Sequence, residues 1–524
     1  MVYQNSYSLC LEAFVANLKE CIKRKDLKKG LKLHALFEGN GFIRNHPFVG
    51  SILVDLYVKC GSFSKARETF DRLPVNGVLT WNALILGYIE NREYKKVFEL
   101  FDHMNLESIC PDSVTFVCTM KACGQIRDIK KGKEMYVRIA AHEGFWRNVS
   151  VGGALVDMHV KLGSLIEAQT IFDSLPVRDV MTWTSLIGGY ADHGYCTLAL
   201  SCFQQMQLDG INPDAWTFFC SLKACIGIGA DAIYEGQAIY AEICRKGFLD
   251  GNIFLCCNLI HMYAKCGFPR RSQEVFDKSS ARNVISWTAL ILGYAENSHA
   301  EKAMDCFEKM KVEGISPNEV TYISILKACT NTPETINKGR QIHKEIECKG
   351  FLEEEPAIGN SLVDLYARWG LLDDAQIVFN SLFKKDTASW NVLIAGYCEN
   401  GHGEEALECY GWMQSNGFSP DVVTFTCLLK ACGLTRNADK GEVIHTEISR
   451  RGLLGTDVVI GNALVDMYFK CGLVEKAQEV FIKLQGKDVV TWTTLIGGWV
   501  ESGHSDHALE WFEKMLLEGI SPNL

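Results

Sequence analysis

The chain has 524 residues, of which 48% are hydrophobic and 22% charged, and 53 basic residues against 63 acidic ones give a net charge of −10. This composition is ordinary for folded protein and excludes a disordered, collagen-like or mucin-like chain. No run of 18 uncharged apolar residues occurs, so we expect no membrane span. The acidic balance excludes a polybasic nucleic-acid binder but not a local basic surface.

Cysteine and proline usage adds two expectations. With 11 prolines and 45 glycines, the chain is expected to form many helices joined by short turns, and its 22 cysteines indicate reduced thiols in an intracellular compartment. No C-x-x-C occurs, and the pairs Cys118/Cys123, Cys220/Cys225 and Cys427/Cys432 are five residues apart. On a helix this spacing turns by about 140°, which suits two ligands of one metal poorly. We therefore predict apolar core roles for these thiols, and no metal or cofactor.

A repeat of about 103 residues fills the chain. The segment that begins at Val78 returns at Val180, Val284, Thr387 and Val489. Each unit divides into three predicted helical hairpins of different length, preceded by an N-terminal segment, 1–10. The 35-residue type covers 78–112, 180–214, 284–318, 387–421 and 489–523; the long type, of 36 to 38 residues, covers 11–46, 113–148, 215–252, 319–355 and 422–457; the short type, of 31 residues, covers 47–77, 149–179, 253–283, 356–386 and 458–488.

Apolar periodicity predicts that each hairpin is helical. In 78–112, Trp81, Leu84, Ile85 and Tyr88 follow the i, i+3, i+4, i+7 pattern of one helix face, and a second such stripe begins at Val97. The closing Pro-Asp pair is expected to end the second helix. One hairpin cannot bury its apolar face alone, so we predict an all-α, right-handed solenoid of about fifteen stacked hairpins.

Landmark residues give a specific resemblance. Every 35-residue hairpin has Trp at its fourth place and Pro at its penultimate place, long hairpins carry Lys-Ala-Cys, and short ones carry Tyr-x-Lys-Cys-Gly or a variant. Over 11–523 the chain resembles plant-type pentatricopeptide repeat proteins of the PLS subfamily, without their C-terminal extension and DYW deaminase domains. The alternative is the tetratricopeptide repeat, a protein-binding scaffold that shares the landmarks Trp287, Gly293, Tyr294, Ala303 and Phe307 but lacks the three-length alternation.

Two places in each 35-residue hairpin, the fifth and the last, hold only short polar side chains. These pairs are Asn82/Asp112, Thr184/Asp214, Thr288/Asn318, Asn391/Asp421 and Thr493/Asn523. Amides, hydroxyls and carboxylates offer defined donor and acceptor patterns to a base edge, and helical repeats that read one base each are a known mode of RNA recognition. The alternative is a helix cap at the last place and a cap or an exposed polar residue at the fifth.

The two-residue code implied by the resemblance assigns bases to these pairs: Asn with Asp reads U, Thr with Asp reads G, and Thr with Asn reads A. The short hairpins add Asn360/Asp386 and Asn462/Asp488, both U. Three other short hairpins depart from the pattern: Ser51/Gly77, Gly153/Asp179 and Cys257/Asn283. Four long hairpins have an apolar residue at the fifth place: Val15, Val117, Phe219 and Ile323. The exception among the long hairpins is Thr426/Asp457, which favours G. The implied RNA site, read 5′ to 3′, is n-n-U-n-n-G-n-n-A-n-U-U-(G)-U-A.

Two further sets of residues are candidates for RNA contact. Second-place residues fit either contact with a base face or core packing: Leu79, Met181, Ile285, Val459 and Val490. One basic residue in each short hairpin is a candidate phosphate contact or a favourable cation at a helix C-terminus: Lys59, Lys161, Lys265, Arg368 and Lys470. The matching places of the 35-residue hairpins are acidic, which weakens the electrostatic case.

No catalytic motif is complete. The triplets at His343, His402 and His445 have the form His-x-Glu, but the Pro-Cys-x-x-Cys that a zinc deaminase also needs is missing, so we expect no enzyme. The resemblance implies binding of single-stranded RNA in mitochondria or plastids, most naturally to mark sites for C-to-U editing by a deaminase supplied in trans. The alternatives are RNA stabilisation, processing or splicing, and a protein-only scaffold.

The two ends of the chain leave questions open. Met1 to Cys10 contains no basic residue and matches neither a secretory signal nor an Arg-rich transit peptide, so either the address is absent or the precursor is longer. Leu524 follows a complete hairpin without a polar cap, which favours a truncated chain or a partner docked there.

Overall fold

The fold is helical throughout the part of the chain that the computed structural model describes. Residues 2–38, 47–73, 76–140, 148–249, 251–279, 282–330, 335–354, 356–455 and 457–522 are described. All regular elements in these ranges are helices and none is a strand, which confirms the expected all-α class. None of these helices is both long and apolar enough to cross a bilayer. The chain forms two compact units, Met1–Met262 and Tyr263–Leu524, divided within α16 (Ile253–Lys265).

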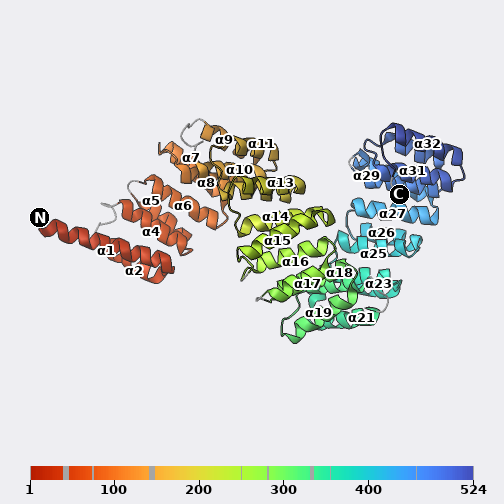
Figure 1. Cartoon of the computed structure of the whole chain (residues 1–524), viewed down its shortest axis with the longest axis horizontal. Helices are drawn as coiled ribbons and strands as arrows, with labels where there is room; N and C mark the ends of the chain where they lie inside the picture. The colour runs from red at the N-terminus through yellow and green to blue at the C-terminus, as the bar shows by residue number, and fades with distance from the viewer. Residues whose placement is uncertain are drawn as a thin grey trace. The chain divides into compact units, whose positions relative to one another are not determined.

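The first unit is a succession of helical hairpins, each with a first and a second helix that lie beside their sequence neighbours (Figure 1). Its elements are α1 (Val2–Arg24), α2 (Leu27–Glu38), α4 (Pro47–Lys59), α5 (Phe63–Arg72), α6 (Val78–Glu90), α7 (Tyr94–Leu106), α8 (Ser113–Ile126), α9 (Ile129–Ala140), α10 (Val149–Lys161), α11 (Leu165–Ser174), α12 (Val180–Asp192), α13 (Cys196–Leu208), α14 (Ala215–Ile228), the 3-10 turn η1 (Ala230–Ala232) and α15 (Ile233–Arg245). First helices pack on first helices, as α10 does on α8 and α12. Because α1 begins at Val2, it includes most of the segment 1–10 that the sequence analysis set apart.

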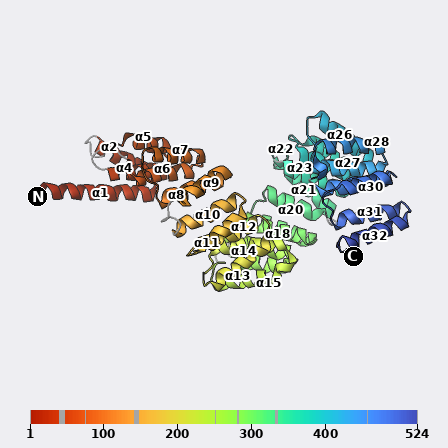
Figure 2. The ribbon, with the colours of Figure 1, turned by 90° about the horizontal axis from the view of Figure 1, so that it is seen from above.

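The second unit repeats this arrangement, and Figure 2 shows its last pair, α31 and α32, side by side. Its elements are α17 (Pro269–Lys278), α18 (Val284–Glu296), α19 (Ala300–Val312), α20 (Glu319–Cys329), α21 (Ile336–Cys348), α22 (Phe351–Glu354), α23 (Pro356–Arg368), α24 (Leu372–Ser381), α25 (Thr387–Glu399), α26 (Gly403–Ser415), α27 (Val422–Thr435), α28 (Ala438–Arg450), η3 (Leu453–Gly455), α29 (Val458–Lys470), α30 (Val474–Lys483), α31 (Val489–Glu501) and α32 (Ser505–Leu517).

The short hairpins differ from the 35-residue ones mainly in the length of the second helix. The first helices α6 and α10 both have 13 residues, but the second helix α7 has 13 and its counterpart α11 only 10. Three residues are close to one helical turn. A short hairpin therefore keeps the full first helix, which carries the fifth-place residue, and loses a turn from its partner.

A Trp–Phe contact joins each short hairpin to the 35-residue hairpin after it. Trp183 is buried and its ring centroid lies 4.6 Å from that of Phe172, nearly edge-on at 73°. The other four fourth-place tryptophans are also buried, and each contacts a Phe of the preceding short hairpin. Aromatic rings bury a large apolar area each, so these contacts help to hold one hairpin against the next.

The expected role of the Pro-Asp pair is wrong in one respect. The second helix α7 ends at Leu106, and Ser108 then adopts the left-handed conformation (φ 58°). Glycine holds the same place in the other 35-residue hairpins, as at Gly210 (φ 75°), because it adopts this conformation without steric cost. The helix is thus ended by the left-handed residue, and Pro111 and Asp112 lead into the next helix.

Candidate nucleic-acid interface

In the four 35-residue hairpins that another hairpin follows, the last residue caps the first helix of that next hairpin. Asp112 accepts the backbone N–H of Thr115 at 2.9 Å, and the Asp112 N–H donates to the Thr115 hydroxyl at 3.2 Å, which forms a capping box. The same box occurs at Asp214, Asn318 and Asp421. The capping alternative considered for this place is therefore correct. Base reading by the same side chain stays a prediction.

The fifth residue lies beside this cap. Asn82 is buried, and its Nδ2 donates to Asp112 Oδ1 at 2.9 Å. Asn391 makes the equivalent bonds to Asp421, at 3.0 and 3.1 Å. The structure thus brings together two residues 30 positions apart that the sequence analysis paired by their place in the repeat.

Hydrogen bonding keeps the carboxyl group of Asp421 ionised. Its partial burial raises the pKa, but the backbone N–H of Thr424, the Asn391 amide and the Thr424 hydroxyl together outweigh this effect, and the pKa lies below its ordinary value. An ionised carboxylate only accepts hydrogen bonds, so at neutral pH this place offers an acceptor alone.

Threonine at the fifth place makes a different contact. Thr184 and Thr288 are buried, and their hydroxyls lie 2.7 Å from the hydroxyls of Thr217 and Thr321. Thr493 differs again, because it donates to the carbonyl of Val490 at 3.0 Å, and its predicted partner Asn523 lies outside the described residues.

The short hairpins also bring their pairs together. The side chain of Asn360 lies beside the carboxyl group of Asp386, and that of Asn462 lies beside the carboxyl group of Asp488. Of the three departures, Asp179 and Asn283 cap their helices as the others do, whereas Gly77 caps without a side chain. In the long hairpins, the Thr426 hydroxyl donates to the carbonyl of its own helix at Val422.

The second-place residues are exposed, so core packing is not their role. Leu79 is 64% exposed, and Met181, Ile285, Val459 and Val490 are all at least half exposed. Residues that the sequence analysis did not select at this place are exposed too, including the large side chains of Phe48, Trp216 and Phe254. All of them occupy the second place of a hairpin, and this shared position in the repeat could have identified them from the sequence.

A groove of about 670 Å³ runs along the first helices α8, α10, α12 and α14 of the first unit. The pair Thr184/Asp214 lines it together with the exposed Met181 and Trp216, and Trp216 stacks on Phe219 at 4.7 Å with the rings almost parallel. Flat apolar side chains beside defined donors and acceptors are suited to an unstacked nucleobase.

The candidate phosphate contacts are all engaged in ion pairs. Lys59 pairs with Glu90 at 2.6 Å and Lys265 with Glu296 at 3.0 Å, in both cases with the acidic residue of the next hairpin. The other three, Lys161, Arg368 and Lys470, pair with an Asp four residues earlier on their own helix.

The lysine of the Lys-Ala-Cys motif in the long hairpins is a further cation engaged in an ion pair, although the sequence analysis did not select it as a phosphate contact. Lys223 bonds Asp192 at 2.6 Å, and both line the groove, as do Lys161 and Asp157. The cations at this edge are therefore largely balanced by carboxylates, which would have to be displaced or screened for a phosphate to bind.

Comparison with known proteins agrees with the resemblance. The model of the PPR repeat family matches residues 76–125, 178–227, 282–331, 385–433 and 487–524, and the PPR repeat model matches 51–78, 254–284, 360–386 and 462–489. A mitochondrial pentatricopeptide repeat-containing protein of Arabidopsis thaliana is 30% identical over 99% of this chain and 67% of its own length. This chain belongs to the pentatricopeptide repeat family.

Other similar proteins carry the same family name. The chloroplastic protein DOT4 of Arabidopsis thaliana is 34% identical over 96% of this chain and 57% of its own length. Among solved structures, the pentatricopeptide repeat protein PPR10 from maize is 18% identical with a TM-score of 0.49, covering 97% of this chain and 89% of that one.

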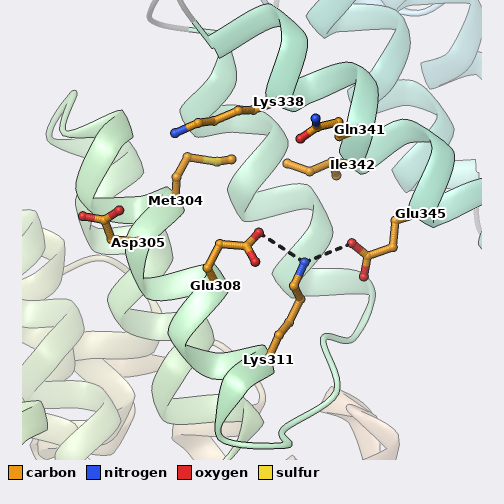
Figure 3. Close-up of a pocket in the computed structure, with 8 residues that line it drawn as sticks. All are labelled: Met304, Asp305, Glu308, Lys311, Lys338, Gln341, Ile342 and Glu345. Atoms are coloured by element: carbon orange, nitrogen blue, oxygen red, sulfur yellow. Dashed lines mark hydrogen bonds and ion pairs between the residues drawn. The ribbon is translucent and has the colours of Figure 1, made fainter.

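Two of the three His-x-Glu triplets of this pentatricopeptide repeat protein, those at His343 and His445, take part in packing between helices, whereas the exposed His402 bonds Glu405 three residues later. His343 Nδ1 lies 2.9 Å from the Tyr366 hydroxyl, and His445 Nδ1 lies 2.8 Å from that of Tyr468. Glu345 borders a hollow of about 270 Å³ between α19 and α21, where Lys311 reaches both Glu308 and Glu345 (Figure 3). In the described ranges no group of three or more His, Cys, Asp or Glu could hold a metal ion.

Five of the six paired cysteines are buried, as predicted for apolar core residues, and Cys427 is half-buried. Burial raises the pKa of Cys118 to about 11 and that of Cys123 and Cys220 to about 12, so these thiols stay protonated at neutral pH. A protonated, buried thiol is a poor nucleophile and a poor metal ligand.

We expect the stability of the protein to fall as the pH drops below about 6.5. Burial, and to a lesser degree Lys483, lower the pKa of His445 in the folded state, so the unfolded chain binds the proton more readily. The contribution of neutral His445 to the free energy of unfolding is complete above about pH 6.5. It is lost as the pH falls toward the pKa of the folded state, by at most ~1.4 kcal/mol per pH unit. Urea unfolding at pH 7.5 and 5.5 measures it: His445→Gln should reduce the pH dependence, and His299→Gln, at an exposed site, should not.

Proposed function

We propose that this pentatricopeptide repeat protein binds single-stranded RNA sequence-specifically, with one base at each hairpin. The observation that carries the proposal is the recurrent side-by-side placement of the fifth and last residues, as in Asn82 and Asp112 at 2.9 Å, at the edge of exposed second-place apolar residues. An apolar surface holds a base by its face, and the polar pair then discriminates its edge. A protein-binding scaffold gives no reason for this pairing.

The finer role we propose is site recognition for C-to-U editing of organellar RNA, as a member of the PLS subfamily with a deaminase supplied in trans. The shortened second helices, such as the 10-residue α11, support the three-length alternation of that subfamily. Curated relatives named mitochondrial and chloroplastic support an organellar address. RNA stabilisation, processing and splicing remain the competing roles, because they use the same RNA-binding surface.

A competition binding assay with the whole chain tests RNA recognition. The probe is a 15-nucleotide RNA with U at positions 3, 11, 12 and 14, G at 6 and 13, and A at 9 and 15; the competitor has the same composition in permuted order. Because each mismatch costs about 1–3 kcal/mol, we expect the permuted RNA to bind more than ~10-fold more weakly. Equal affinities would exclude sequence-specific reading through these pairs.

The editing role has a separate test. RNA recovered with the protein from organelles should contain a footprint that matches the implied site, with an edited cytidine close to it. A reproducible footprint without any edited cytidine nearby would instead support stabilisation or processing, and the absence of bound RNA would favour the scaffold.

A further inference from the structure

A third hydroxyl residue contacts each described reading pair of the 35-residue hairpins. It is the third residue of the following hairpin, which we call the third-place hydroxyl: Thr115, Thr217, Thr321 and Thr424. Each is completely buried. It belongs to the capping box of its own helix, but its hydroxyl also reaches the fifth residue of the preceding hairpin, 33 positions earlier.

Beside asparagine, the third-place hydroxyl determines which way the amide faces. Thr115 Oγ1 lies 2.7 Å from Asn82 Oδ1 and 3.0 Å from Asp112 Oδ1. Its one proton goes to the nearer Asn82 oxygen, because Asp112 Oδ1 already accepts from the Thr115 N–H and from Asn82 Nδ2, each at 2.9 Å. A flipped amide would place its nitrogen against the hydroxyl and its oxygen against a carboxylate, which is unfavourable. The Asn82 oxygen is therefore occupied, and the group it can offer a base is the remaining Nδ2 hydrogen, a donor.

Beside threonine, the same hydroxyl has the opposite consequence. Thr217 Oγ1 lies 2.8 Å from Asp214 Oδ1 and 2.7 Å from Thr184 Oγ1. A hydroxyl has one proton, and the carboxylate can only accept, so the Thr217 proton goes to Asp214 and Thr184 must donate to Thr217. Thr184 then offers a base only its lone pairs, an acceptor. Thr288, Thr321 and Asn318 repeat this arrangement at 2.7 Å for both contacts.

We propose that the third-place hydroxyl is a positioning residue for base selection, because it sets whether the fifth residue presents a donor or an acceptor. The proposal rests on the proposed RNA-binding function. A presented donor favours the carbonyl oxygens of U, whereas a presented acceptor favours the ring and amino N–H groups of purines. The short hairpins lie outside the proposal: Ser389 bonds Asp386 at 2.9 Å, and Asn360 Oδ1 is buried without a partner among the described residues.

The chain offers a matched control for the capping role. Thr182 accompanies Asp179 in a similar way, with its N–H at 2.8 Å and its hydroxyl at 2.6 Å from Asp179 Oδ1, although the Asp179 N–H does not complete a capping box. The fifth place next to it is Gly153, where an added Cβ would lie 3.0 Å from the Thr182 hydroxyl. Thr182→Val therefore removes the hydroxyl that contacts the capping carboxylate, as Thr115→Val does, but there is no fifth-place side chain to misplace.

The experiment measures the affinity ratio for the 15-nucleotide RNA with U or G at position 3, using the whole chain. We expect the wild type to prefer U by roughly 5- to 150-fold. In Thr115→Val the ratio should fall to within about twofold of unity, Thr115→Ser should restore it, and Thr182→Val should leave it unchanged. Thr217→Val is the second test, because it should abolish the preference for G over U at position 6.

The outcomes separate the two proposals. A wild type that shows no preference at position 3 or 6 would overturn both base reading and the positioning role. If the wild type prefers the expected base and both Thr115→Val and Thr217→Val keep the full preference, only the positioning role is overturned. If Thr182→Val lowers the ratio at position 3 as much as Thr115→Val does, the hydroxyl acts through helix capping and the positioning role is likewise overturned.

Discussion

Replacing Thr184 by Asn is expected to change the preferred base at position 6 of the RNA from G to U. The introduced asparagine would meet the same surroundings as Asn82, with Asp214 in place of Asp112 and Thr217 in place of Thr115. Its amide can therefore donate to the carboxylate and accept from the hydroxyl. The fifth place would then present a donor instead of an acceptor.

The size of this change follows from one good base contact. Each such contact discriminates between bases by about 1–3 kcal/mol, or roughly 5- to 150-fold in affinity. The affinity for the G-containing RNA should therefore fall, and that for the U-containing RNA should rise, by a factor in this range. The salt dependence should stay the same, because no phosphate contact changes. Competition between two RNAs that differ only at position 6 measures the effect.

The reciprocal variant Asn391→Thr serves as the control. It should shift the preference at position 12 from U toward G and leave position 6 unaffected. If Thr184→Asn weakens both RNAs equally, Thr184 only packs or caps, and the assignment of bases to pairs loses its foundation.

Replacing Trp287 by Ala should destabilise the second unit by about 3–5 kcal/mol. Trp287 is buried, and its ring centroid lies 4.5 Å from that of Phe276 in the preceding hairpin. Removal of the indole therefore leaves a cavity between two stacked hairpins. Neighbouring hairpins depend on such interfaces, and the loss should also lower the cooperativity of unfolding. Urea unfolding followed by circular dichroism at 222 nm measures both effects.

Trp287→Phe is the matched variant. The buried indole Nε1 has no hydrogen-bond partner among the described residues, so Phe loses ring area but breaks no hydrogen bond. We expect it to cost well under half of the alanine effect. A loss below about 1 kcal/mol for Trp287→Ala would show that the interface is held by other contacts.

The sequence alone was sufficient for the repeat, the helical class and the pairing of the fifth and last places in the 35-residue hairpins. Apolar residues at i, i+3, i+4 and i+7 specify a helix and its buried face locally, and Trp81 and its counterparts mark the same place in every copy. Asp or Asn before a helix with Thr or Ser three residues later is a cap signal that needs no tertiary information, and Asp112 and Asp421 cap as such residues do.

Only the tertiary structure decided what those positions contact. Periodicity places Leu79 and Met181 on a helix that is apolar nearly all round, and it cannot tell which residues the neighbouring hairpins leave uncovered. The ion pair of Lys59 with Glu90 and the bond of Thr115 to Asn82 join residues 31 and 33 positions apart. Such contacts depend on how one hairpin stacks on the next, because stacking sets the distance between first helices, and no local pattern in the chain encodes that distance.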